Sequence, residues 1–220
     1  MKVTERELDT YRPKGLEGSQ WEELKFCNLP WHQLKVALTK DILPKEVVKQ
    51  YTDIALKAKD KNIVVLLGSV GVGKTIMGIR YMVRCLYEGM SPPLYLSHID
   101  LKVIMDGRLG IELDYHDTLR AYQTRLKHPY AIDKENYVAL EDVCSHYGVV
   151  MIDDFSRPHY EIISDLIEKA YQTNCKLILT SNDTPEDLRK GLPERVRSRL
   201  REHGVIKRIY GKDLRGGEDE

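Results

Sequence analysis

Short runs of consecutive apolar residues mark the expected strands of this chain. The clearest is IVVLL at 63–67, and the others are LYLS at 94–97, VVMIDD at 149–154, CKLILT at 175–180 and VIKRIY at 205–210. Runs that are apolar at nearly every position are typical of strands buried on both faces, as in parallel sheets. The pattern therefore predicts a parallel sheet of five strands.

Between these runs, apolar residues recur at helical spacing. Helices are expected over residues 44–59, 76–86, 99–105, 115–126, 134–146, 160–172, 185–190 and 193–202. Strands that alternate with helices predict an α/β fold with helices on both faces of the sheet. In such folds, ligands bind at the carboxyl ends of the strands.

The N-terminal part of the chain differs from the rest in composition. Residues 1 to about 20 are polar and contain Pro13, Gly15 and Gly18, which indicates a flexible arm or the edge of a partner site. The segment WEELKFCNLPWHQLKVAL at 21–38 is rich in aromatic residues and leucine, and we expect it to pack against the core or to line a base pocket. The predicted organisation is an arm and lead-in segment at 1–43, one α/β domain at 44–215 and an acidic tail at 216–220.

A glycine-rich sequence, GSVGVGKT, follows the first apolar run. It fits the pattern G-x-x-x-x-G-K-[ST], in which backbone N–H groups surround a phosphate chain and the next helix adds its positive N-terminal end. Lys74 would reach the β and γ phosphates, and the Thr75 hydroxyl would hold Mg²⁺. The phosphate-binding residues are expected to be Gly68, Ser69, Val70, Gly71, Val72, Gly73, Lys74, Thr75 and Ile76. The alternative is a glycine turn before an ordinary helix.

Polar residues follow two further apolar runs. Asp153 and Asp154 end VVMIDD, and Ser181 and Asn182 follow CKLILT. Asp153 fits a carboxylate that supports Mg²⁺, Asp154 a base for an attacking water, and Asn182 a hydrogen-bonding partner of the γ-phosphate or the water. The alternatives are a helix N-cap for the Asp pair and an ordinary turn for Ser-Asn.

The segment LPERVRSRLREHG at 192–204 carries four arginines. On a helix, Arg195 and Arg199 share one face and Arg197 and Arg201 share another, so the four cannot all serve one ligand. One pair is expected to meet solvent or acidic neighbours. One arginine could instead reach a nucleotide on an adjacent subunit.

Composition narrows the class of protein only slightly. Lys plus Arg and Asp plus Glu are 34 each, so net charge neither favours nor excludes nucleic acid. The four cysteines are scattered, which is typical of reduced packing residues and not of a zinc site or disulfide framework. The N-terminus lacks a signal-peptide pattern and no run approaches the length of a membrane span, so we expect a cytoplasmic protein with no membrane contact.

The order GSVGVGKT, VVMIDD, LILTSN, LPERVRSRL and HGVIKRIYGKDLR resembles the AAA+ ATPases of the DnaC/IstB group, over roughly residues 60–215. The resemblance implies a three-layer P-loop NTPase fold with a central parallel five-stranded sheet. Lys74 and Thr75 correspond to Walker A, Asp153 and Asp154 to Walker B, Asn182 to sensor 1, and Arg199, with Arg195 beside it, to the arginine finger. Few residues follow the last strand, so a helical lid is not expected, and Arg215 is a weak substitute for its second sensor.

The same resemblance implies an ATP- and Mg²⁺-dependent helicase loader acting in DNA replication. Its partners would be single-stranded DNA, a replicative DNA helicase and, with ATP bound, further copies of the chain. In related initiators, helices before Walker B contact DNA; the corresponding residues here are Tyr115, Arg120, Tyr122, Arg125, Lys127, His128 and Tyr130, although helix packing explains the tyrosines equally well. The alternatives are an IstB-like transposition ATPase acting on target DNA, a P-loop kinase for a small metabolite, and an adaptor that binds ATP and scarcely hydrolyses it.

Overall fold

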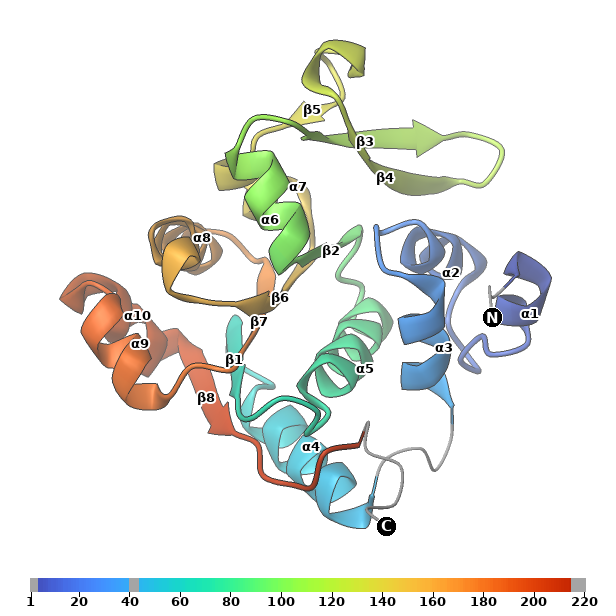
Figure 1. Ribbon diagram of the computed structural model, residues 1–220. Helices are drawn as coiled ribbons and strands as arrows, with labels where there is room; N and C mark the ends of the chain where they lie inside the picture. Colours follow the sequence, from blue (N-terminus) through green and yellow to red (C-terminus); the bar gives the residue numbers. More distant parts are fainter. Residues whose placement is uncertain (1–3, 40–43, 215–220) are drawn as a thin grey trace.

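A five-stranded parallel sheet forms the centre of the structure, a computed structural model that describes residues 4–39 and 44–214 (Figure 1). Its strands are β1 (Ile63–Leu67), β2 (Pro93–Ser97), β6 (Val149–Phe155), β7 (Lys176–Ser181) and β8 (Gly204–Arg208). They lie in the order β2-β6-β7-β1-β8, and every neighbouring pair is parallel. The predicted five-stranded parallel sheet is confirmed.

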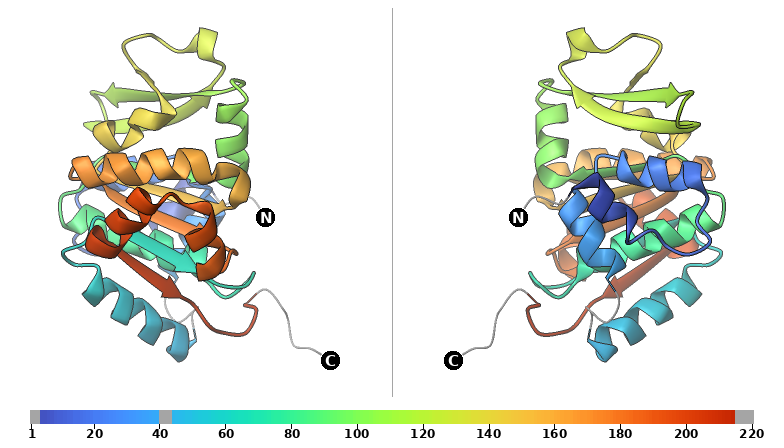
Figure 2. Two further views of the ribbon diagram at one scale, coloured as in Figure 1. Left: turned by 90° about the vertical axis from the view of Figure 1, so that its left-hand side faces the viewer. Right: turned by 90° about the vertical axis from the view of Figure 1, so that its right-hand side faces the viewer.

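Helices cover both faces of this sheet, because alternate strand residues point to opposite sides. In β1, Val64 and Leu66 join one buried cluster, whereas Ile63, Val65 and Leu67 join the other. The first cluster contains residues of α1 (Glu5–Asp9), α2 (Gly18–Lys25), α3 (Trp31–Leu38), α4 (Lys45–Lys57) and α5 (Lys74–Tyr87). The second contains residues of α6 (His98–Met105), α7 (Val143–His146), α8 (Tyr160–Gln172), α9 (Pro185–Gly191) and α10 (Glu194–His203). The result is the expected three-layer α/β fold (Figure 2).

The N-terminal segment packs on the core more closely than its polar sequence indicates. Leu8, in the expected flexible arm, is fully buried, and Trp21 donates from Nε1 to Asp9 Oδ1 at 2.7 Å. The ammonium group of Lys25 lies 3.0 Å from Glu5 Oε1 and 3.1 Å from Asp9 Oδ1. These contacts join α1 to α2, so the expectation of a flexible arm is wrong for residues 4–20. The expected packing of the lead-in segment at 21–38 against the core is confirmed. The predicted boundary at residue 43, Arg215 and the acidic tail lie outside the described residues.

The region between β2 and β6 contains a second sheet in place of the expected helix over 115–126. Strands β3 (Gly110–His116), β4 (Ala121–Lys127) and β5 (Tyr137–Val138) pair antiparallel in the order β4-β3-β5. Residues 121–127 pair one for one with residues 110–116, so the backbone hydrogen bonds of this segment join two strands instead of the turns of a helix. The expected helix over 134–146 is likewise reduced to α7, preceded by β5 and a short 3₁₀ turn (Leu140–Asp142).

Two general features complete the architecture. All four cysteines are buried free thiols, which confirms their packing role. Among residues 4–39 and 44–214, no helix combines the length and apolar character needed to cross a membrane.

Candidate active site

The glycine-rich loop joins β1 to α5, the strand–loop–helix setting that its motif requires. Gly71 and Gly73 have φ angles of +80° and +94°, which side chains other than glycine rarely adopt. Gly73 is the N-cap of α5, and the helix begins at Lys74. The loop therefore presents backbone N–H groups and the positive end of a helix in one place, as a phosphate site needs.

Lys74 connects this loop to the end of β7. Its side chain is largely buried, and Nζ donates to the carbonyl oxygens of Gly68 and Ser69 and to Asn182 Oδ1, each at 2.8 Å. The positive charge is thus held between the phosphate loop and the residue expected to act as sensor 1.

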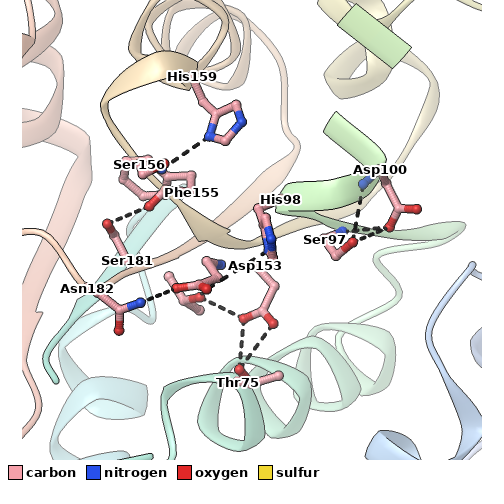
Figure 3. A network of polar contacts seen from close by, with 12 residues as sticks. Thr75, Ser97, His98, Asp100, Asp153, Phe155, Ser156, His159, Ser181 and Asn182 are labelled. Carbon is pink, nitrogen blue, oxygen red and sulfur yellow. Dashed lines mark hydrogen bonds and ion pairs between the residues drawn. The ribbon is translucent and has the colours of Figure 1, made fainter. Parts of the chain in front are cut away.

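Asp153 is bound by hydroxyl groups from three different elements. Figure 3 shows its contacts with Thr75. Thr75 Oγ1 of α5 lies 2.9 and 3.1 Å from its two carboxylate oxygens, and Thr180 Oγ1 of β7 donates to Oδ1 at 2.6 Å. Tyr95 of β2 donates to Oδ2 at 2.9 Å. Thr75 and Asp153 supply hard oxygen ligands, the type that Mg²⁺ prefers together with its own waters, so the pair fits that ion.

Asp154 has an unusual backbone conformation for a non-glycine residue, with φ of +60°. The pairing of β6 with β7 shifts register between Ile152 and Phe155, so the chain bulges at this residue. Asp154 N donates to Thr180 Oγ1 at 2.8 Å, and Asn182 Nδ2 donates to the Asp154 carboxylate. The strained backbone directs the carboxylate toward the same edge of the sheet as Lys74, an arrangement common at functional sites.

Three residues that sequence reasoning missed take part in this network. Thr180 bonds the side chain of Asp153 and the backbone of Asp154, Tyr95 bonds Asp153, and His98 Nδ1 lies 3.9 Å from Asp154 Oδ2. Burial, together with the charge of Asp153, raises the pKa of Tyr95, so its hydroxyl keeps its proton. Polar residues near the ends of buried strands were the available signal for Thr180 and Tyr95.

The arginines of α10 divide between two acidic partners, as their helical spacing predicts. Arg195 and Arg199 lie beside Glu168 of α8, whereas Arg197 and Arg201 both pair with Glu194. The guanidinium carbon of Arg199 lies 3.9 Å from the centre of the Tyr171 ring. These contacts hold Arg199 on the face of the sheet opposite α5. The structure therefore brings together Lys74, Thr75, Asp153, Asp154 and Asn182, but not Arg199.

The expected DNA-contacting residues lie on the second sheet. Tyr115 and Tyr122 are cross-strand neighbours whose ring centres are 5.2 Å apart, and Tyr130 is 94% exposed. Lys127 is paired with the buried carboxylate of Glu112, and the chain from 110 to 138 holds five acidic and four basic residues. The surface thus offers exposed rings but no concentration of positive charge.

Neither a protein-family model nor a curated protein matches this chain. Among solved structures, a candidate primosome component from Streptococcus pyogenes serotype M3 matches with a TM-score of 0.58 and 18% identity, over 90% of this chain and 98% of that one. DnaI matches with a TM-score of 0.48 and 17% identity, over 86% and 94%.

AMPPCP-bound DnaA from Aquifex aeolicus matches with a TM-score of 0.49 and 16% identity, over 79% of this chain and 50% of that one. The chain therefore spans about half the length of this DnaA chain. The likeness to the Streptococcus pyogenes protein, together with the strand order, confirms the expected three-layer α/β fold with a central parallel five-stranded sheet.

Proposed function

We propose that this chain binds ATP with Mg²⁺ and hydrolyses it, as a AAA+ ATPase acting in DNA replication. The observation that carries the proposal is the convergence of Lys74, Thr75, Asp153, Asp154 and Asn182 at the carboxyl ends of β1, β6 and β7. A phosphate loop, a pair of carboxylates and a polar residue bonded to both are the parts that phosphoryl transfer to water requires.

Each residue has a defined task in this reaction. The loop from Gly68 to Ile76 binds the phosphate chain, and Lys74 turns from the loop carbonyls to the β and γ phosphates. Thr75 and Asp153 hold Mg²⁺, which when bound neutralises charge on the phosphates. Asp154 accepts a proton from the attacking water while Asn182 orients it. The new P–O bond forms to that water and the bond to the β-phosphate oxygen breaks, releasing ADP.

Arg199 completes the site of a neighbouring copy in an ATP-dependent homo-oligomer. Its contacts with Glu168 and Tyr171 keep it on the face of the sheet away from its own phosphate loop, which supports a role in another subunit. Arg199 would have to leave Glu168 to reach a phosphate. When the proposed oligomer forms, Arg199 therefore exchanges its contact with Glu168 for a contact with a phosphate of the nucleotide on the neighbouring copy.

The cellular role that we propose is the loading or remodelling of a replicative DNA helicase on single-stranded DNA. The likeness to a candidate primosome component over nearly the whole of both chains supports this role. An IstB-like transposition ATPase, acting on target DNA, remains the alternative. Exposed Tyr115 and Tyr122 of the second sheet, and Tyr130 in the 3₁₀ turn (Pro129–Ala131) that follows β4, offer rings on which bases could stack.

Two measurements test the proposal with the full chain. Binding of a fluorescent ATP analogue and release of phosphate are measured with and without Mg²⁺, and with and without a single-stranded oligonucleotide. Lys74→Ala is the binding-deficient control. We expect Mg²⁺-dependent hydrolysis that the variant lacks. Tight binding with no hydrolysis, even with DNA, would favour the adaptor alternative, and phosphate transfer to a metabolite would favour a kinase.

The partner is tested by co-purification from the native host in ATP and in ADP, with identification by mass spectrometry. Recovery of a replicative helicase that depends on ATP supports the loader role. Recovery of a transposase in its place supports the transposition role.

A further inference from the structure

The N-terminal lead-in segment reaches the metal-supporting carboxylate through one tyrosine. Tyr95 of β2 donates its hydroxyl proton to Asp153 Oδ2, and the hydroxyl oxygen of Tyr95 lies 3.1 Å from Gln33 Oε1 of α3. We propose that Tyr95 is a positioning residue for Asp153 and that the lead-in segment, through Gln33, fixes Tyr95. This inference rests on the proposed ATPase function.

The backbone of Tyr95 is held by the same segment. Tyr95 N donates to the Cys27 carbonyl at 2.9 Å, and Asn28 Nδ2 donates to the Tyr95 carbonyl at 3.1 Å. Asn28 adopts a φ of +67°, a left-handed conformation that Asn tolerates better than most residues. Because β2 is the edge strand of the sheet, these groups would otherwise lack a strand partner on that side. The segment thus binds Tyr95 at its N–H, its carbonyl and its hydroxyl.

The protons of this network can be assigned from its chemistry. A tyrosine hydroxyl has one proton, and a carboxylate is a stronger acceptor than an amide, so the proton points to Asp153. The amide oxygen and nitrogen of Gln33 have the same shape, so exchanging their positions places the NH₂ group where Oε1 is assigned, from which it donates to the Tyr95 oxygen. Gln33 then acts as a donor that holds the hydroxyl in its orientation toward Asp153.

This arrangement fixes one rotamer of Asp153. Thr180 donates to Oδ1 and Tyr95 donates to Oδ2, while Thr75 Oγ1 lies near both oxygens. Tyr95 is 1% exposed, so its ring cannot swing away without disturbing the core. Groups that orient metal-supporting side chains in this way typically affect metal affinity or activity by about 10- to 100-fold.

The test is Tyr95→Phe, which removes only the hydroxyl. We expect the Mg²⁺ concentration for half-maximal ATP hydrolysis to rise by about 10-fold or more. Nucleotide binding without Mg²⁺, measured by fluorescence, should be unchanged, because no Tyr95 contact involves the phosphate loop. The gain in nucleotide affinity on adding Mg²⁺ should shrink in parallel, which gives a second readout that does not depend on turnover.

A matched control is available in Tyr81→Phe. Tyr81 is also buried in the first core cluster, and its hydroxyl donates to the Ala58 carbonyl at 3.1 Å, away from Asp153. This variant loses a buried hydroxyl of the same kind and should keep the wild-type Mg²⁺ dependence. If Tyr81→Phe raises the Mg²⁺ concentration for half-maximal hydrolysis as much as Tyr95→Phe does, the effect of Tyr95→Phe is general destabilisation and the inference is wrong.

Gln33 provides an independent variant at a half-buried position. Gln33→Leu should raise the Mg²⁺ requirement less than Tyr95→Phe does. Gln33→Glu should raise it more than Gln33→Leu, because a carboxylate would compete with Asp153 for the tyrosine proton. In a Tyr95→Phe background, neither Gln33 variant should add to the shift. Equal Mg²⁺ dependence of wild type, Tyr95→Phe and Gln33→Glu overturns the inference, whereas absence of hydrolysis by the wild type overturns the proposed function.

Discussion

The carboxylate of Asp213 lies against the backbone of Gly71 in the phosphate loop. A Cβ atom added to Gly71 would overlap that carboxylate, and Leu214 N donates to the Gly71 carbonyl at 2.9 Å. Upstream, Ile209 N donates to the Leu67 carbonyl at 2.6 Å, so the chain that follows β8 runs along the loop. A negative charge therefore borders the place where the phosphates of a nucleotide are expected.

Asp154 combines a chemical role with a strained backbone, and two variants separate them. Asp154→Asn should keep the fold and ATP binding but lower hydrolysis by about 100-fold or more, since a general base is removed while Asn tolerates φ near +60°. Asp154→Ala should lower hydrolysis similarly and also lower the free energy of unfolding by about 1 kcal/mol. Phosphate release and urea unfolding measure the two effects. Full activity in Asp154→Asn would remove Asp154 from the mechanism.

Arg199 can be tested for action between subunits by mixing two inactive variants. Lys74→Ala lacks the phosphate-binding ammonium group but keeps Arg199, whereas Arg199→Ala keeps its own phosphate loop. An interface that joins the Arg199→Ala loop to the Arg199 of a Lys74→Ala copy is complete, so mixing should restore part of the hydrolysis. Alone, Arg199→Ala should bind ATP normally and hydrolyse it about 10³-fold more slowly in the assembled state.

The control for this experiment is Arg201→Ala on the other face of α10, where Arg201 pairs with Glu194. That variant should hydrolyse ATP like the wild type. Failure of the mixture to recover any activity, or unchanged DNA-stimulated hydrolysis by Arg199→Ala, would contradict the finger assignment.

The parts of the fold and the site that the sequence predicted are those with strong local patterns. The apolar runs of β1, β6 and β7 predicted buried parallel strands, and parallel strands bring Lys74, Asp153 and Asn182 to one edge. The helices over 115–126 and 134–146 were wrong because residues 110–116 pair with residues 121–127 and 137–138 as strands, and the apolar spacing within one segment does not reveal its pairing with another.

The contacts around Asp153 were beyond prediction for a different reason. Tyr95 and Thr180 reach it only because β2 and β7 flank β6 in a particular register, with Leu96 opposite Ile152 and Ile152 opposite Leu179. A shift of one residue would turn each side chain to the other face, and sequence pattern does not determine the pairing of strands far apart in the chain. The φ of Asp154 likewise depends on a bulge that only the pairing creates.

Single-stranded DNA binding, if it occurs on the second sheet, should depend little on salt. Lys127 pairs with the Glu112 carboxylate, whereas Arg125 donates to the neutral side chain of Gln123, so we count Arg120 and Arg125 as the cations near the exposed rings that can meet phosphates. Two neutralised phosphates predict a slope of log affinity against log salt of about −1.4. Fluorescence anisotropy of an oligothymidine at several salt concentrations measures it. A slope steeper than about −4 would place binding on a different, more basic surface.

On the same sheet, Tyr122→Ala should weaken oligothymidine binding by about 10-fold, since a stacked base contributes roughly 1–3 kcal/mol. Tyr87→Ala removes a comparably exposed ring at the end of α5 and serves as the control. Equal affinities of Tyr122→Ala and the wild type would exclude stacking on this residue.

His159 makes the stability of the fold near the site depend on pH. Burial, and the charge of nearby His98, lower the pKa of His159, whose Nδ1 accepts a hydrogen bond from Ser156 N at 3.2 Å. Because the folded-state pKa lies below the unfolded value of about 6.5, the unfolded chain takes up a proton first as the pH falls. The stabilisation by neutral His159 is therefore complete above the unfolded-state pKa of about 6.5. It is lost as the pH falls from this unfolded-state pKa to the folded-state pKa. Urea unfolding at pH 7.5 and 5.5 should show a larger loss for the wild type than for His159→Gln, in which the amide oxygen can still accept from Ser156. An NMR titration midpoint for His159 at or above 6.5 would contradict this account.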